Sequence, residues 1–458
     1  MKSRKSRRFA VLAALAALVA APAAALEDNP EKKLSPDARG RVYGSQAKDG
    51  LAYEYFIPKE YDEKEGANLT VVLHGSNLDR RWTFWNHAAG KFREGDVVVS
   101  PDGTTPNGNG GFNFMGDAKD VARLKALLDE IKAALVVRQT FLYGHSQGSF
   151  FSFHFAGAHP EDVDGICADA SGSWAASKAG SFGHRQAIGI MHGLADPVVP
   201  YGQSRGAYEH YRKQGYPLVH LRTLRGWGHP PEARQAGFVL AWCEGMTSSD
   251  PERVAVAFET LSEGLSNAGD FAAAYAVARR LAGRGGPTLD GASDARKAAA
   301  GKVAKEIEDL AVKHAEAIRK AAASAGKGAP AKAEAAAWVF HLAEFLDEFD
   351  GVPAREALAK EQQALFEKHE SEAGKRLRVY YQKRDKSPAD AFEEGAALLR
   401  DGYLSPSVPA LLPELAEWAK KSKELKIPKA ALAAYGKALP EYEKASEAGS
   451  KAFRSLNR

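Results

Sequence analysis

The chain has 458 residues, of which 45% are hydrophobic and 26% are charged, and its formal net charge is +4. This length exceeds what one hydrophobic core usually supports, so two domains are expected, and the composition is typical of a soluble globular protein. The small net charge, without a basic patch interleaved with aromatic residues, gives no reason to expect nucleic-acid binding.

The N-terminus has the layout of a secretory signal peptide over residues 1–25. A basic head, residues 1–8, precedes an apolar run from Phe9 to Ala20, and small residues follow before Leu26. This order of basic, apolar and small residues is read by the export machinery. The apolar run is too short to span a bilayer comfortably, so no stable membrane span is expected after cleavage. We therefore expect a secreted or periplasmic protein, with a linker over residues 26–39.

From about residue 40 to 247, short apolar runs alternate with amphipathic segments. Strands are predicted at residues 51–57, 68–73, 96–100, 140–143, 163–168, 187–191 and 218–221, and helices at residues 117–135, 201–214 and 231–243. Strands that alternate with helices are typical of a parallel sheet that is covered on both faces. Residues 40–247 are therefore expected to form an α/β catalytic domain.

The texture changes after about residue 248, where Ala, Glu and Lys dominate and strand patterns disappear. Helices are predicted at residues 252–265, 271–281, 295–323, 332–349, 355–382, 389–399, 411–425 and 429–456. Because no repeat recurs at a fixed period, a plain helical bundle is favoured over a repeat array for residues 248–458. The segment 295–323 has few large apolar residues, which indicates an exposed helix or a coiled-coil arm.

The only cysteines are Cys167 and Cys243. An exported protein can form a disulfide, but each cysteine stands in an apolar stretch where a small buried thiol is equally natural. The sequence is compatible both with a disulfide between the two cysteines and with two separate thiols. Neither a CxxC nor an HExxH pattern is present, so no zinc site is predicted.

The pentapeptide Gly144-His145-Ser146-Gln147-Gly148 stands between a predicted strand and a possible helix. A G-x-S-x-G pattern arises by chance, and Gly202 to Gly206 also matches it. However, a nucleophile elbow needs a buried strand before the serine and a helix after it. Ser146 has this context, whereas Ser204 follows a proline-containing loop and falls inside a predicted helix. Ser146 is the predicted nucleophile and Ser204 is interpreted as a surface residue.

A serine hydroxyl needs a base to remove its proton, and the base needs an orienting carboxylate. Asp196 follows the predicted strand 187–191, at the edge where open α/β sheets keep their active sites. His229 lies on a glycine-rich loop after the next strand. Asp196 and His229 are therefore the predicted acid and base. Asp169, which follows the strand 163–168, is a rival acid.

The tetrahedral intermediate needs donors for its oxyanion. The backbone N–H of Gln147, directly after the serine, is one candidate. The second is assigned to the N–H of Ser76, on the loop after an early strand, with Gly75 as a near rival; the imidazole of His74 is expected to be structural. Three aromatic residues could line an acyl or aromatic pocket, although buried aromatic side chains are more often core: Trp82, Trp85 and Phe112.

The motifs LHGSN, YGHSQGS, HGLADPVVP and GWGH together resemble the α/β-hydrolase superfamily. The resemblance covers about residues 40–247 and is nearest to secreted esterases of the polyhydroxybutyrate depolymerase and feruloyl esterase type. It implies an α/β-hydrolase fold with a mostly parallel sheet, here followed by an all-α domain. It also implies that Ser146, Asp196 and His229 form a triad that requires no metal or organic cofactor.

The sequence thus predicts an exported serine hydrolase that cleaves carboxylic esters, of a small molecule or a polymer, through an acyl-enzyme. A serine peptidase of the same fold is the near alternative, because the same triad cleaves amides. The other alternative is a helical binding or scaffolding protein with an incidental hydrolase domain. Under each of these interpretations, the helical half could bind a protein or a wall component.

Overall fold

A computed structural model gives the fold and describes residues 29–81, 95–108, 110–173, 185–268, 270–285, 289–325, 333–384, 386–401 and 408–457. The predicted signal peptide, residues 1–25, lies outside these ranges. Within them, no helix combines the length and the apolar character that crossing a bilayer would require.

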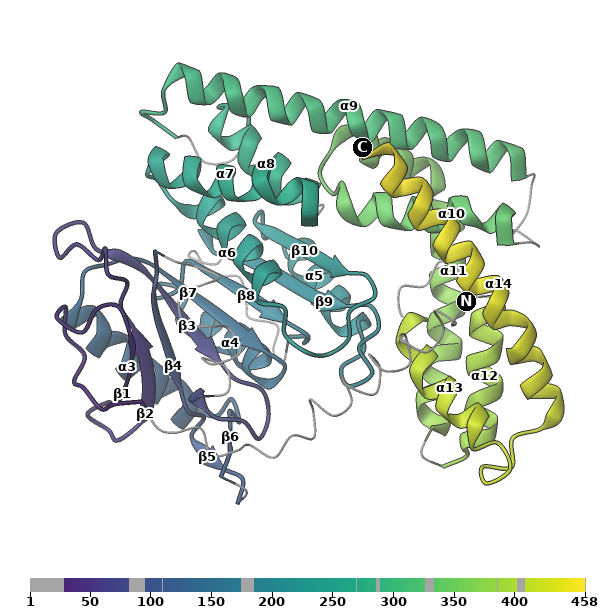
Figure 1. Ribbon diagram of the computed structural model, residues 1–458, viewed down its shortest axis with the longest axis horizontal. Helices are drawn as coiled ribbons and strands as arrows, with labels where there is room; N and C mark the ends of the chain where they lie inside the picture. The colour runs from purple at the N-terminus through teal and green to yellow at the C-terminus, as the bar shows by residue number, and fades with distance from the viewer. Residues whose placement is uncertain are drawn as a thin grey trace, which may run out of the picture.

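The centre of the N-terminal half is an eight-stranded sheet (Figure 1). Its strands, in spatial order, are β1 (Val42–Gln46), β2 (Ala52–Phe56), β4 (Val97–Pro101), β3 (Ala67–Leu73), β7 (Val137–His145), β8 (Gly165–Asp169), β9 (Ala187–Gly193) and β10 (Val219–Leu224). The contacts of β2 with β1 and with β4 are antiparallel, and every other pairing in this sheet is parallel. Only β2 runs against the others, so the carboxyl ends of seven strands lie at one edge. The expected α/β-hydrolase fold with a mostly parallel sheet is confirmed.

Helices cover both faces of the sheet because alternate residues of each buried strand point to opposite sides. On one face, side chains such as Val71, Leu142 and Ile190 pack with α3 (Ala118–Ala134), α4 (Gln147–Ala158) and α5 (Gly202–Lys213). On the other face, neighbours such as Val72, Tyr143 and Met191 pack with α6 (Ala233–Thr247). A short hairpin of β5 (Thr105–Pro106) and β6 (Phe112–Asn113) lies beside the sheet.

The C-terminal half is helical, as predicted. Its helices are α7 (Pro251–Ala268), α8 (Phe271–Leu281), α9 (Asp294–Ala325), α10 (Ala333–Glu348), α11 (Pro353–Lys383), α12 (Pro388–Asp401), α13 (Leu412–Lys420) and α14 (Lys429–Leu456), with a short 3-10 turn at Pro409–Leu411. The long helix α9 is not a free arm: Ala304, Ile307 and Ile318 are buried on one face, against neighbouring helices. Small alanines let these helices approach closely. The segment can therefore be buried on one face although it has few large apolar residues, which is why the sequence suggested an exposed helix.

The two halves share one hydrophobic core. Helix α6 contacts the sheet on one side and α7 and α8 on the other, so a single cluster of buried side chains runs from β7 and β8 to α10. Figure 1 shows the remaining helices, α11 to α14, beyond the ends of β9 and β10. Cys167 of β8 and Cys243 of α6 both lie in this cluster and are buried thiols that are not joined by a disulfide.

Buried charges also join the halves along β10. Arg222 pairs with Glu348 at the end of α10, and His220 Nε2 lies 2.9 Å from Oδ2 of Asp270. The same carboxylate caps α8, because its Oδ1 accepts a hydrogen bond from the backbone N–H of Ala273. These four side chains are largely removed from water, so each depends on its partner in the other half.

The ion pair of Asp270 predicts a pH-dependent contribution to stability. Burial alone would raise the pKa of Asp270, but the charge and hydrogen bond of His220, with Arg222 nearby, lower it from 3.8 to about 2. A carboxyl whose pKa is lower in the folded state stabilises the fold above its unfolded pKa and loses this effect as the pH falls through the folded value. Asp270→Asn should therefore reduce the free energy of unfolding by about 2 kcal/mol at pH 7, and the difference should shrink between pH 4 and pH 2.

Chemical denaturation of the two proteins at several pH values measures this difference. The matched control is Asp117→Asn, since Asp117 also caps a helix, α3, but is exposed. Asparagine caps a helix almost as well as aspartate, so this control should change little. A difference for Asp270→Asn that stayed constant from pH 7 to pH 2 would contradict the assignment.

Candidate active site

Ser146 stands at the junction of β7 and α4, in a strained backbone conformation. Its φ is 53° and its ψ is −118°, a region that residues with a side chain rarely adopt. The backbone holds it there: the N–H of Ser146 donates to the carbonyl of Asp169 over 2.8 Å, and its own carbonyl accepts from the N–H of Ser149 over 3.0 Å. The side chain is half-buried. This is the geometry of a nucleophile elbow, in which strain presents the hydroxyl above the sheet edge.

The glycines of the pentapeptide are required by close backbone contacts. A Cβ added to Gly148 would lie 2.1 Å from the carbonyl oxygen of Leu73, on the neighbouring strand β3, and one added to Gly144 would lie 2.5 Å from the backbone of Gly148. Neither space can hold a methyl group. By contrast, a Cβ added to Gly206 of the second pentapeptide would meet nothing within 4 Å. Tertiary contact therefore separates two pentapeptides that look alike in sequence.

Asp196 and His229 are hydrogen bonded to each other. Oδ2 of Asp196 lies 2.7 Å from Nδ1 of His229, and its Oδ1 accepts from the backbone N–H groups of Val198 and Val199 over 2.8 and 3.0 Å. The carboxylate is almost fully buried, at 1% exposure. Burial pushes the pKa of Asp196 upward, but hydrogen bonds and charge from its two histidine neighbours outweigh it, so the pKa lies well below its ordinary value. Asp196 is therefore an anion across the physiological range.

The rival acid, Asp169, is bonded to a residue other than His229. Its Oδ2 accepts a hydrogen bond from the hydroxyl of Tyr143 over 3.2 Å. It is buried, and burial raises its pKa well above the ordinary value, with further repulsion from Asp196. The hydrogen bond to His229 is made by Asp196, whereas the carboxyl of Asp169 is bonded to Tyr143, so the geometry favours Asp196 as the candidate acid.

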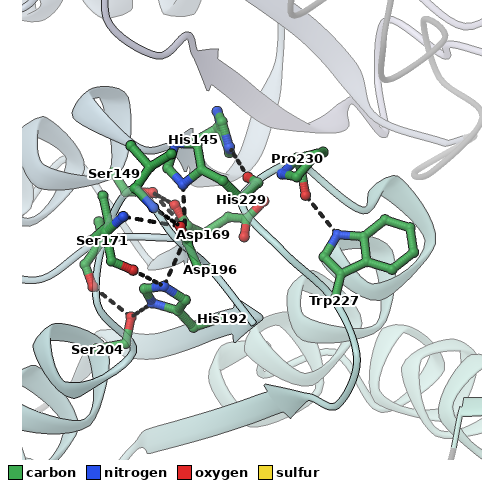
Figure 2. A network of polar contacts seen from close by, with 12 residues as sticks. His145, Ser149, Asp169, Ser171, His192, Asp196, Ser204, Trp227, His229 and Pro230 are labelled. Atoms are coloured by element: carbon green, nitrogen blue, oxygen red, sulfur yellow. Dashed lines mark hydrogen bonds and ion pairs between the residues drawn. The ribbon is translucent and has the colours of Figure 1, made fainter. Parts of the chain in front are cut away.

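The loop that carries His229 is anchored beside the serine. Nε2 of His145, the residue before Ser146, lies 2.8 Å from the backbone carbonyl of His229, and the two imidazole centroids are 4.9 Å apart (Figure 2). Trp227 holds the same loop, because its indole N–H donates to the carbonyl of Pro230 over 2.6 Å. No hydrogen bond between the Ser146 hydroxyl and His229 is formed among the described residues. The structure thus joins the acid to the base and brings the base loop to the residue before the serine.

The predicted oxyanion loop lies against the serine. A Cβ added to Gly75 would be 3.5 Å from the Cβ of Ser146, so this loop passes directly over the elbow. The loop is held by the buried His74, whose Nδ1 lies 2.8 Å from the carbonyl of Gly75 and whose Nε2 accepts from the N–H of Gly103 over 2.9 Å. His74 is thus structural. Ser76 is exposed, and its N–H donates no hydrogen bond within the described ranges.

Gln147 is the first residue of α4, so its N–H has no acceptor within that helix. Its side-chain Oε1 accepts from the N–H of Phe114 over 3.1 Å, which ties the elbow to the segment after β6. Phe112 of β6 is half-buried and bonds through its backbone to Asn77 and Leu78. The other two predicted pocket residues, Trp82 and Trp85, lie outside the described residues.

The structure adds two residues that sequence reasoning missed. Nε2 of His192 lies 3.0 Å from Oδ2 of Asp196, and Nδ1 of the same ring lies 2.7 Å from Oγ of Ser204. Ser204 was predicted to be a surface residue, and this is wrong: it is fully buried, because α5 turns it inward toward the end of β9. The only sequence signal was a histidine four residues before the acid, and such spacing does not reveal where a side chain points.

The helical half reaches the neighbourhood of the acid. Burial raises the pKa of Tyr381 in α11, and the charge of Asp196 is among the smaller causes of that rise. A cavity of about 710 Å³ lies between the halves, with Ala195 and Gly226 on one side and Phe340 and Tyr442 on the other. Ser146 is not among the residues that line it, so this cavity is separate from the serine.

One group of described residues could offer three ligand atoms to a metal: His159, Glu161 and Asp162, whose ligand atoms lie within 4.8 Å of one another. It follows the C-terminal end of α4, whereas Ser146 precedes the N-terminal end of that helix. The group is partly exposed, and its members pair with each other and with lysines. It is therefore remote from the candidate active site.

Solved structures similar to this chain include a feruloyl esterase module from Clostridium thermocellum (13% identity, 44% of this chain and 89% of that chain, TM-score 0.34). They also include Est1E from Butyrivibrio proteoclasticus (15% identity, 42% and 90%, TM-score 0.32) and esterase PE8 (21% identity, 44% and 96%, TM-score 0.33). No protein-family model and no curated protein matches the sequence. Likenesses this distant carry no information on the reaction, so the assignment of fold rests on the strand order and the elbow of the chain itself.

The contrast between the two pentapeptides predicts opposite effects of one substitution. Gly148→Ala should destabilise the protein by about 1–3 kcal/mol or prevent folding, because its methyl group has no space beside Leu73. Gly206→Ala, within α5, should stabilise it by about 1 kcal/mol, because alanine favours a helix and nothing obstructs it. Thermal unfolding of both variants measures the difference. Equal effects would mean that the elbow packs less tightly than described.

Proposed function

We propose that this protein is an exported serine hydrolase that cleaves carboxylic esters through an acyl-enzyme at Ser146. The observation that carries the proposal is the meeting, at one sheet edge, of a strained serine elbow with a buried, hydrogen-bonded Asp196–His229 pair. Strain at a residue with a side chain persists only where the surrounding structure enforces it, and it concentrates at functional sites.

The reaction begins when a substrate carbonyl lies above Ser146. Nε2 of His229 takes the hydroxyl proton as Oγ attacks the carbonyl carbon, and the N–H groups of Gln147 and Ser76 donate to the oxyanion. His229 then returns the proton to the leaving alcohol, which departs as the acyl-enzyme forms. A water molecule, deprotonated by the same imidazole, attacks the acyl carbon; the bond to Oγ breaks, and His229 returns the proton to Oγ of Ser146 as the acid is released.

Asp196 serves this cycle by holding one tautomer of His229. A carboxylate only accepts hydrogen bonds, so the contact of 2.7 Å requires a proton on Nδ1 and leaves Nε2 free to act as the base. When His229 takes the serine proton, the anion of Asp196 stabilises the imidazolium. The lowered pKa of Asp196 means that this charge is present wherever His229 can act as a base.

Export is proposed from the sequence alone, on the basic head and apolar run before Leu26. No metal or organic cofactor is needed by this chemistry. A targeting role of the helical half, through a protein or wall component, is tested with the full chain. One such test compares its localisation with that of a variant in which surface residues of α11 to α14 are exchanged.

The first test is the loss of activity in Ser146→Ala. Turnover of short p-nitrophenyl esters should fall by roughly 10⁴-fold or more, and labelling by a fluorophosphonate probe should disappear, because the probe bonds to an activated serine. Mapping the labelled peptide identifies the residue. The control is Ser262→Ala, which alters a half-buried serine of α7 and should leave both readouts unchanged.

The same assay separates an esterase from a peptidase. Peptide substrates compared side by side with the esters reveal which bond is cleaved faster. The proposal fails if purified protein turns over no ester, or if Ser146→Ala equals the wild type in every assay.

The second test distinguishes the two candidate acids. Asp196→Asn should lower kcat by roughly 10⁴-fold, because an amide at this position favours the wrong tautomer of His229. Asp169→Asn should retain most activity, since that carboxyl is bonded to Tyr143 rather than to His229 and asparagine has nearly its shape. Steady-state kinetics with one ester substrate measures both. If Asp169→Asn were the more damaged variant, the assignment of the acid would be wrong.

A further inference from the structure

His192 and Ser204 form a buried pair behind the acid, and neither belongs to the proposed triad. Figure 2 shows them on the side of Asp196 away from the His145 contact, with Ser171 completing the chain of hydrogen bonds. Both side chains are fully buried, at 0% exposure. Polar groups excluded from water in this way are costly unless their hydrogen bonds are made within the protein.

The acceptors around His192 determine where its ring carries a proton. Nε2 lies 3.0 Å from the carboxylate Oδ2 of Asp196 and 2.9 Å from the carbonyl of Val199. Both of these oxygens can only accept, so Nε2 must be an N–H donor. The same Oδ2 also receives the Nδ1–H of His229 over 2.7 Å. Two histidines therefore donate to one carboxylate oxygen from two different positions.

Ser204 fixes the other end of the ring. Its Oγ lies 2.7 Å from Nδ1 of His192 and 2.5 Å from the backbone carbonyl of Ser171. The ring is thus held at both nitrogens, between the end of β9 and helix α5. Tyr201, in an edge-on contact with 5.8 Å between ring centroids, closes one side of the space. Held in this way, the imidazole cannot turn without breaking several buried hydrogen bonds.

We propose that His192 is a positioning residue for the reaction, which fixes the carboxylate of Asp196 so that Oδ2 faces His229; this inference rests on the proposed function. The backbone N–H groups of Val198 and Val199 hold Oδ1, and His192 holds Oδ2, so the carboxylate plane has no freedom to rotate. Because the site is buried, water cannot replace the lost donor. Misplacement of a catalytic group by a fraction of a bond length has a large effect on rate.

The other titratable groups near Asp196 do not share this role. Asp169, His145 and Tyr381 interact with it electrostatically, but among the described residues none of the three is hydrogen bonded to its carboxylate. His192 itself is enclosed and cannot touch a substrate. Its effect on the reaction passes through Asp196.

The test compares His192→Leu with His192→Gln. Leucine removes the Nε2–H donor, whereas a glutamine amide can place an N–H close to the original Nε2. With an ester substrate, His192→Leu should lower kcat on the order of 10-fold to 100-fold with little change in KM, and His192→Gln should recover much of the loss. Ser204→Ala is the milder variant if leucine prevents folding, and it should lower kcat to a smaller extent.

A second readout does not depend on turnover. Histidine side-chain NMR, with signals assigned by comparison with His229→Gln, measures the pKa of His229. If His192 aligns the carboxylate, His192→Leu should lower the pKa of His229, because a misaligned anion stabilises the imidazolium less. If His192 merely competes for the carboxylate, the same substitution should raise it. The control is His341→Leu, which removes a buried histidine bonded to His314 in the helical half, and it should change neither kcat nor this pKa.

The outcomes separate the two proposals. The positioning role would be overturned if a folded His192→Leu protein had an unchanged kcat, or an unchanged or raised pKa of His229. Ester turnover by the wild type would in that case leave the proposed function intact. Conversely, a lowered pKa in a protein without Ser146-dependent activity would show that His192 aligns the carboxylate of Asp196 but would defeat the proposed function, and with it the role of this alignment in the reaction.

Discussion

The site depends on one buried anion. The carboxylate of Asp196 is almost excluded from water, and such a charge is tolerated only where several donors replace its hydration. Four N–H groups do so: two from the turn that follows it, one from His192 and one from His229. The same bonds that make burial of the charge possible also set its orientation. Stability of the loop and alignment of the base are therefore consequences of one arrangement.

The sheet brings this anion to the serine. Because β7, β9 and β10 run parallel within one sheet, their carboxyl ends open onto the same edge, and the loops after them carry Ser146, Asp196 and His229. Contacts between the loops then refine the placement. Gly193, for example, leaves space for the carbonyl of Trp227, which a Cβ would approach to 2.3 Å. The strained elbow persists because β3 packs directly beneath it.

The helical half is part of the same structural unit as this edge rather than a loosely tethered addition. Its helices continue the hydrophobic core through α6, and its carboxylates pair with Arg222 and Arg225, which belong to β10 and the turn after it. The loop that bears His229 begins at that turn. A change in how α10 packs on β10 would therefore change the position of His229. The helical half is thus physically connected to the candidate site.

Periodicity, turn residues and motif order were sufficient to predict most elements: α8 and α14 occupy the predicted ranges, and the strand before each candidate residue was found. Local chemistry also distinguished Ser146 from Ser204 by its strand-to-helix context. However, sequence alone could not show that Ser204 is buried, that α9 packs along one face, or that Asp169 turns toward Tyr143. Those facts depend on which side chains meet across elements distant in the chain. The sequence by itself determined which residues are candidates for the chemistry and on which loops they lie; only the tertiary structure decided which of them share hydrogen bonds, because such contacts depend on strand register and packing that no local pattern encodes.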